Sequence, residues 1–149
     1  MARSCIRDAG LLGWLHLIRV YNKIQHRSAI LLRGYNLTPA QFDVLAHLSA
    51  AQGISQQALA ERLLVTKGNV CGIIDRLEER RLLQRRSDPE DRRAYRLFLT
   101  DAGQRLAEEV VPAQEALIND LLACLSLEEQ RQVHALLCKL DRAVDDDLP

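Results

Sequence analysis

The residues best suited to chemistry are the arginines that gather between residues 80 and 96. Seven arginines fall in this stretch against three acidic residues, so its local charge is 7 − 3 = +4 in a chain whose formal net charge is zero. Each phosphate that such a cation neutralises releases condensed counterions from a nucleic acid. The stretch therefore indicates a polyanion-binding edge, although a solvated loop with internal ion pairs would show the same composition.

A second group of candidate residues lies on a predicted helix whose apolar side chains recur at helical spacing. With that row turned inward, Gly68, Gly72 and Arg76 point outward. Glycine inside a helix costs roughly 0.5–1 kcal/mol relative to alanine, so an exposed pair suggests that something large approaches closely. The alternative is an ordinary solvated helix with tolerated glycines. The inward row consists of Val70, Ile73, Ile74 and Leu77.

The first turn of the same helix carries further polar groups. Thr66, Lys67 and Asn69 lie where unpaired backbone amides favour a phosphate. Asparagine can read adenine in the major groove, and lysine can read guanine. These types at this place are consistent with a helix that reads a base sequence.

Capping residues and periodicity indicate the elements that must hold these groups. Short helices are expected to begin after Thr38, Ser55 and Thr66, the first with a capping box and a proline at its first position. The period then changes, and "LLQRR" and "AYRLFLT" are typical of two strands around an exposed turn. A capped helix fits the major groove, and a hairpin tip bearing arginine fits the minor groove.

Longer amphipathic helices flank this centre, which gives a mainly α fold with a small β-hairpin. One is expected from Asp8 to Leu32, and two follow Thr100, where Pro112 predicts a kink or break. We divide the chain into an N-terminal helix (1–34), a central domain (35–100) and C-terminal helices (101–149).

The central residues resemble the MarR family of winged helix-turn-helix transcription regulators. The resemblance covers "LTPAQFDVLAHL" and then "SQQALAERLLVTKGNVCGIIDRLEERRLLQRRSDPEDRRAYRLFLTDAGQRL", close to half the chain. It implies a homodimer whose N- and C-terminal helices interlock. The helix after Thr66 would be the recognition helix, and residues 87–93 would form the wing.

The resemblance also implies roles in the wing and a partner. Arg92 would enter the minor groove and Arg93 would brace the wing through an acidic partner, or the reverse, while Asp91 shapes the turn. The partner would be a palindromic double-stranded DNA operator. Arg85, Arg86 and Lys67 would position the protein on it, whereas Asn69, Arg76 and a wing arginine would read sequence. The full expected set is Ser55, Gln56, Thr66, Lys67, Gly68, Asn69, Gly72, Arg76, Arg85, Arg86, Asp91, Arg92 and Arg93.

Two kinds of signal are open for such a regulator. A small anionic aromatic effector is expected if Trp14, His16, Arg19, Tyr21 and His47 line a pocket; the alternative is a core tryptophan with surface histidines. The other signal is oxidation of a cysteine, for which Cys5 and Cys71 are the candidates. The two remaining cysteines, Cys124 and Cys138, have the surroundings of small hydrophobic fillers.

Other classes of protein find little support in the sequence. Scattered histidines and the lack of a phosphate-binding glycine loop argue against an enzyme, and the cysteines lack zinc spacing, so we expect neither cofactor nor metal. No apolar run approaches a membrane span, and unpaired cysteines favour the reducing cytoplasm. The main alternative is a winged-helix module that binds proteins rather than DNA.

Overall fold

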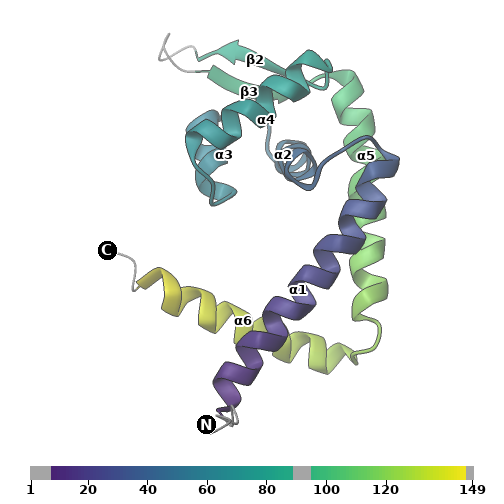
Figure 1. The fold of residues 1–149 in the computed structure, drawn as a ribbon. Helices are drawn as coiled ribbons and strands as arrows, with labels where there is room; N and C mark the ends of the chain where they lie inside the picture. Colours follow the sequence, from purple (N-terminus) through teal and green to yellow (C-terminus); the bar gives the residue numbers. More distant parts are fainter. Residues whose placement is uncertain (1–7, 89–94, 147–149) are drawn as a thin grey trace, which may run out of the picture. The chain divides into compact units, whose positions relative to one another are not determined.

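The computed structural model describes residues 8–88 and 95–146 of the chain (Figure 1). The fold is mainly helical with a small antiparallel sheet, as predicted. The chain divides into two compact units, residues 1–114 and 115–149. In chain order the elements are α1 (Ala9–Gly34), α2 (Pro39–Ala50), β1 (Ile54–Ser55), α3 (Gln56–Arg62), α4 (Lys67–Glu79), β2 (Leu83–Ser87), β3 (Tyr95–Leu99), α5 (Asp101–Leu122) and α6 (Leu127–Asp146).

The predicted helix starts are confirmed by their capping bonds. At α2 the Thr38 backbone N–H donates to Gln41 Oε1 over 3.0 Å, and the Gln41 N–H donates to Thr38 Oγ1 over 3.2 Å. The hydroxyl of Ser55 caps α3, and the hydroxyl of Thr66 caps α4. Each bond satisfies an amide that has no partner within its own helix, which fixes where α2, α3 and α4 begin.

The sheet has the order β1-β3-β2, and both pairings are antiparallel. The predicted hairpin is confirmed, with Leu83 opposite Leu99 and Ser87 opposite Tyr95. The sequence did not predict β1, because two residues are too few to show an alternation. The short strand matters because it leads directly into α3.

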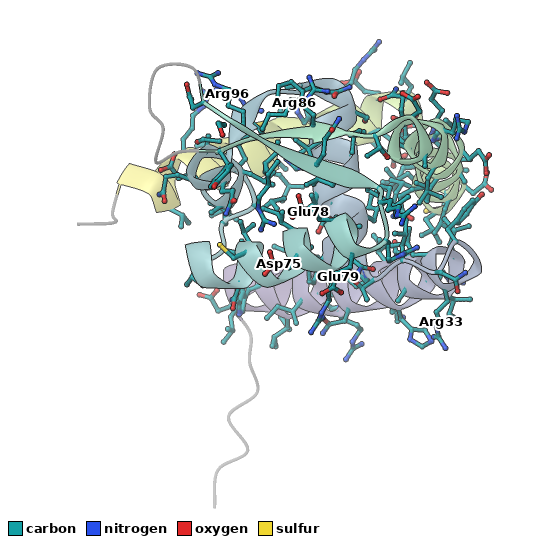
Figure 2. All side chains as sticks on the ribbon, turned by 90° about the horizontal axis from the view of Figure 1, so that it is seen from above. Arg33, Asp75, Glu78, Glu79, Arg86 and Arg96 are labelled. Atoms are coloured by element: carbon teal, nitrogen blue, oxygen red, sulfur yellow. The ribbon has the colours of Figure 1, made fainter. Side chains whose placement is uncertain are left out.

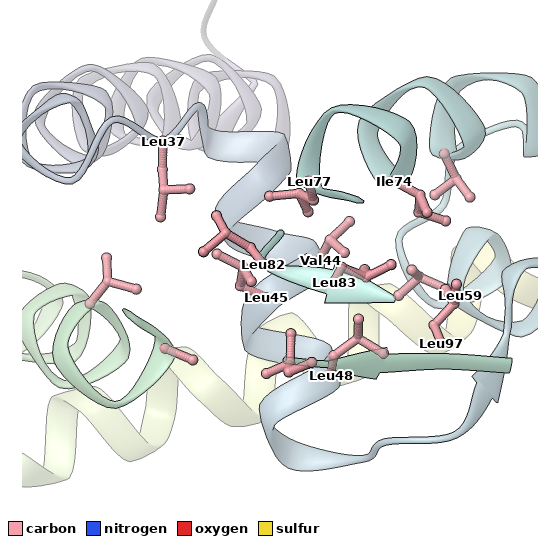
Figure 3. Packing of buried hydrophobic residues seen from close by; sticks show 14 of the residues in the cluster. Leu37, Val44, Leu45, Leu48, Leu59, Ile74, Leu77, Leu82, Leu83 and Leu97 are labelled. Carbon is pink, nitrogen blue, oxygen red and sulfur yellow. The ribbon is translucent and has the colours of Figure 1, made fainter. Parts of the chain in front are cut away.

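Leucine, isoleucine and valine side chains from the three short helices and the sheet form most of the core (Figure 3). Leu32 of α1 and Val110 of α5 are also buried in it. Val44 and Leu45 of α2, Ile74 of α4 and Leu97 of β3 are fully buried. Burying a side chain of this size contributes about 1.5–3 kcal/mol, so the core fixes α4 against the sheet. The fixed helix can then present its outer face.

Helix α5 is anchored to this core at its first turn. Thr100 Oγ1 donates to the Arg81 carbonyl over 2.6 Å and accepts from the Gly103 N–H over 3.1 Å. The predicted break at Pro112 is wrong, because α5 continues to Leu122. Glu108, whose carbonyl would have accepted from residue 112, is exposed, so water can solvate that carbonyl instead.

Within the described residues, no single helix is long and apolar enough to cross a membrane. The bent pair of α5 and α6 has the length and composition of a broken span.

Candidate nucleic-acid interface

The outer face of α4 is open, as its glycines suggested. Gly68, Asn69, Gly72 and Arg76 are all exposed. A Cβ atom added at either glycine would meet nothing within 4 Å. Lys67 begins the helix, but its side chain lies outside the described part of the structure. The two glycines therefore leave open space on a face that also carries the exposed side chains of Asn69 and Arg76.

Arg85 does not project from β2 into solvent. Its guanidinium forms ion pairs with Asp75 and Glu78 of α4, and Nε donates to Gln56 Oε1 over 2.9 Å. Burial disfavours its charged form, but the hydrogen bonds to Asp75 and Glu78 outweigh this and raise the pKa of Arg85. With three of its five donors engaged and 19% of its side chain exposed, Arg85 braces α4. This arrangement does not favour the phosphate contact expected from the sequence.

Gln56 belongs to the same internal network. Its Nε2 donates to Cys71 Sγ over 3.2 Å while its Oε1 accepts from Arg85. The residue is half-buried, and it joins the start of α3 to α4 and β2. Neighbouring Ser55 uses its hydroxyl for the α3 cap, accepting from the Ala58 N–H over 3.1 Å. The side-chain groups of both residues are thus engaged within the chain.

Arg86, the next residue on β2, is placed differently. It is exposed, and its side chain is labelled in Figure 2. Its guanidinium lies 4.4 Å from the centre of the Phe98 ring. Stacking over an aromatic face orients the cation without neutralising it, so the N–H groups stay available. Arg86 therefore keeps the geometry that a phosphate contact requires.

Arg96 is a site residue that the sequence reasoning did not include. Its Nε donates to Asp88 Oδ2 over 2.8 Å, and its Nη1 donates to the Gly53 carbonyl over 3.3 Å. The available signal was the strand alternation, which set Arg96 apart from its apolar neighbours. The predicted wing residues Asp91, Arg92 and Arg93 lie outside the described residues.

The expected effector residues do not converge in the described structure. An open groove of about 730 Å³ runs along α1, and of the expected set only Arg19 lines it. Trp14 and Tyr21 are 54% and 59% exposed, and His47 lies on α2 with Nδ1 2.8 Å from the Asp43 carbonyl oxygen. His16 is also exposed, with its Nδ1 against the Leu12 carbonyl. The residues lining the groove are Leu15, Ile18, Arg19, Asn22, Lys23, His26 and Arg27.

The cysteines have varied surroundings. Cys71 is half-buried beside Gln56, whereas Cys5 lies outside the described residues. The interpretation of Cys124 as a core filler does not hold within one chain, because it is exposed. Cys138 is half-buried, and its Sγ lies 3.4 Å from His134 Nε2. Among the residues described here, no three histidine, cysteine or acidic side chains are grouped so that they could hold a metal ion.

Comparison with known proteins gives consistent matches. The family model described as MarR family matches residues 35–94. The HTH-type transcriptional repressor MdtR of Bacillus subtilis is 34% identical over 133 residues, which cover 89% of this chain and 86% of MdtR. An HTH-type transcriptional regulator of Bacillus cereus is 33% identical over 134 residues, 89% of each chain.

Solved structures agree with this result. The Staphylococcus aureus MepR–DNA complex matches with a TM-score of 0.82 and 27% identity, over 87% of this chain and 97% of MepR. A probable transcriptional regulator from Pseudomonas aeruginosa matches with a TM-score of 0.71 and 31% identity, over 81% and 93% of the two chains.

Proposed function

The chain belongs to the MarR family, and from this premise we propose that it is a homodimeric transcription regulator of palindromic double-stranded DNA. Each subunit inserts α4 into the major groove and sets its wing, residues 87–93, in the adjacent minor groove. The relative MdtR is named a repressor, so we propose repression of transcription in the cytoplasm.

The open face of α4 is the observation that carries this proposal. Its two glycines leave room for a large partner, and Asn69 and Arg76 border that room with groups that read base edges. An α-helix fits into the major groove, which is roughly 12 Å wide. MepR, whose fold this chain shares, has been solved in complex with DNA.

The surface charge near α4 supports the same partner. Arg86 remains exposed, Lys67 begins α4, and one of the wing arginines Arg92 and Arg93 is expected in the minor groove. Arg85 is neutralised by Asp75 and Glu78, so we count about three phosphate contacts per subunit. Two subunits would then give a slope of log K against log salt near −5, at about −0.9 per contact.

A second copy of the chain is the partner that the flanking helices favour. Apolar side chains of the first half of α1 and along α6 are exposed in the single chain. Contiguous apolar faces of this kind are normally covered by another protein. On α1 they are Leu11, Leu12, Trp14, Leu15, Leu17, Ile18, Val20 and Tyr21, and on α6 they are Leu127, Val133, Leu136, Leu137, Leu140 and Val144.

Dimerisation would also complete an effector site. All residues that line the α1 groove belong to α1, so the groove is open on its other side. The side chains of Arg19, Lys23 and Arg27 in this groove suit an anionic ligand. A second copy would supply the other wall. We propose that an anionic aromatic effector releases DNA from this site, with oxidation of Cys5 or Cys71 as the competing signal.

Selection of bound duplexes from a random pool tests the function directly. We expect a palindrome with half-site centres about one helical turn apart. Arg92→Ala should weaken binding and relax preference in an A·T-rich flank, whereas Lys67→Ala should weaken all sequences alike. Binding to random duplexes should fall steeply with salt. A flat response with no selected sequence would instead favour a winged-helix module that binds proteins.

A further inference from the structure

Arg96 connects three segments that meet beside the wing. It lies on β3, pairs with Asp88 immediately after β2, and donates to the Gly53 carbonyl in the turn before β1. The carboxylate of Asp88 is only 11% exposed, whereas the Arg96 side chain is 42% exposed. An ion pair with one largely buried member restricts that member strongly, so Asp88 is held where β2 ends.

The strand register gives a physical reason for this ion pair. Arg86 of β2 lies directly opposite Arg96 of β3. Like charges directly opposite each other destabilise an antiparallel pair. Each arginine has its own partner, since Arg86 stacks over Phe98 and Arg96 engages Asp88. The Arg86 guanidinium therefore remains available to a binding partner, whereas the Arg96 guanidinium is engaged by contacts within the chain.

The Gly53 end of the contact is also well fixed. The Gly53 N–H donates to the Leu97 carbonyl over 2.8 Å, so the residue is held through both its N–H and its C=O. Its φ of +78° favours glycine, and an added Cβ would lie 3.3 Å from the Phe98 ring. Two residues later Ser55 caps α3. Arg96 thus ties the start of the helix-turn-helix to the start of the wing.

We infer that Arg96 is a positioning residue that sets the direction in which the wing leaves the sheet relative to α3 and α4. It acts through Asp88 and Gly53 and does not itself bind DNA. This inference rests on the proposed function, because positioning matters only if the wing contacts a partner that α4 also contacts. It adds to the expected site a residue that never touches the ligand.

Affinity measurements on full-length variants test the role. Arg96→Gln should weaken binding of the selected operator roughly fivefold per subunit, hence roughly 25-fold for a dimer. The loss should be much smaller when Arg96→Gln is added to Asp88→Asn, because residues that act as one unit are not additive. The control is Arg105→Gln, which removes an exposed charge on α5 and should bind like the parent chain.

A second cycle separates positioning from direct phosphate contact. In a chain that already carries Arg92→Ala and Arg93→Ala, the wing no longer contacts DNA through these arginines, so Arg96→Gln should cost little further affinity. An undiminished loss in that background would mean that Arg96 contacts DNA itself and would overturn the inference.

Amide hydrogen exchange without DNA supplies an independent readout. Arg96→Gln should speed exchange at Gly53 and at the paired residues Ser87 and Tyr95, and leave the amides in the middle of α4 unchanged. Unchanged exchange at Gly53 would contradict the inference whatever the affinity. If the parent chain binds no duplex at all, the proposed function fails, and exchange still decides whether Arg96 holds these segments together.

Discussion

At the scale of single residues, neighbouring arginines on one strand have different environments. Arg85 is enclosed by Asp75, Glu78 and Gln56, whereas Arg86 lies exposed over Phe98. The first pairs with two carboxylates of α4 and offsets part of their negative charge, on the helix that we place against DNA. The second retains its charge for the DNA. Charge count alone does not distinguish them, because only the partners decide which cation is available.

Substitution should separate the two roles. Arg85→Gln removes the cation that pairs with Asp75 and Glu78 and should lower the free energy of unfolding by about 1–2 kcal/mol, a value reduced because both carboxylates are partly exposed. Arg86→Gln should change it by less than about 1 kcal/mol and weaken DNA binding instead. Urea unfolding measures the first effect. Adding Asp75→Asn and Glu78→Gln to Arg85→Gln should restore stability, and failure to do so would contradict the brace.

The residue types at this site could be predicted from the sequence, but their partners could not. Arginines in a hairpin and glycines on an outward helical face follow from local spacing. The contacts of Arg85 join residues 7, 10 and 29 positions apart, which meet only when α3, α4 and β2 pack. Arg96 was not included because its role depends on Gly53, which lies 43 positions away.

The glycines of α4 allow a test in which stability and binding move in opposite directions. Gly72→Ala fills open space on a helix and should stabilise the fold by about 0.5–1 kcal/mol. Its methyl group would stand where we place DNA, so operator affinity should fall. Thermal unfolding and a binding titration on the same preparation measure both. Unchanged affinity in the stabilised variant would place the DNA elsewhere.

At the scale of elements, the junction between the winged helix and α5 depends on one close approach. A Cβ atom built at Gly103 would lie 1.9 Å from the Leu82 carbonyl oxygen, and Gly103 is buried. The first turn of α5 therefore packs against the backbone just before β2. Sequence periodicity predicted α5 but gave no sign of this contact, because a glycine near a helix start shows no periodic pattern.

Gly103→Ala should accordingly be severely destabilising. The clash is with backbone, so the first turn of α5 must shift, and we expect a loss of about 3 kcal/mol or more, at the upper end of overpacking costs. Urea unfolding of the purified variant, or its yield of folded protein, measures this. The same substitution at Gly72 is the matched control. A near-neutral Gly103→Ala would show that α5 does not sit so closely on Leu82.

The start of α6 depends on a charged capping box. Glu129 accepts from the Ser126 N–H and hydroxyl, both over 2.8 Å, and the backbone bond followed by the hydroxyl bond lowers the pKa of Glu129. The stabilisation of the fold by the Glu129 carboxylate is therefore complete above the pKa that Glu129 has in the unfolded chain, about 4.3. It is lost as pH falls through the lower pKa of Glu129 in the folded chain. Glu129→Gln should weaken this acid dependence in circular dichroism. An identical acid profile in parent and variant would contradict it.

At the scale of the whole molecule, a single chain leaves too much apolar surface uncovered. Among the described residues of α6 none is fully buried, and Leu136 and Val144 are 68% and 56% exposed. An amphipathic helix gains most of its stability from packing its apolar face. A second copy of the chain would supply that packing with the same residues, as a two-fold interface does.

Disrupting this face should strongly weaken operator binding without touching a DNA contact. Leu137→Glu places a charge among apolar side chains, so sedimentation at micromolar concentration should change from dimer to monomer. A monomer reaches one half-site, so affinity for the palindrome should fall by about 100-fold or more, because the second half-site is no longer engaged at high effective concentration. Gln132→Glu adds the same charge at an exposed polar position of α6 and should remain dimeric. If Leu137→Glu stayed dimeric and bound the operator as the parent does, the partner of α6 would be something other than a second copy.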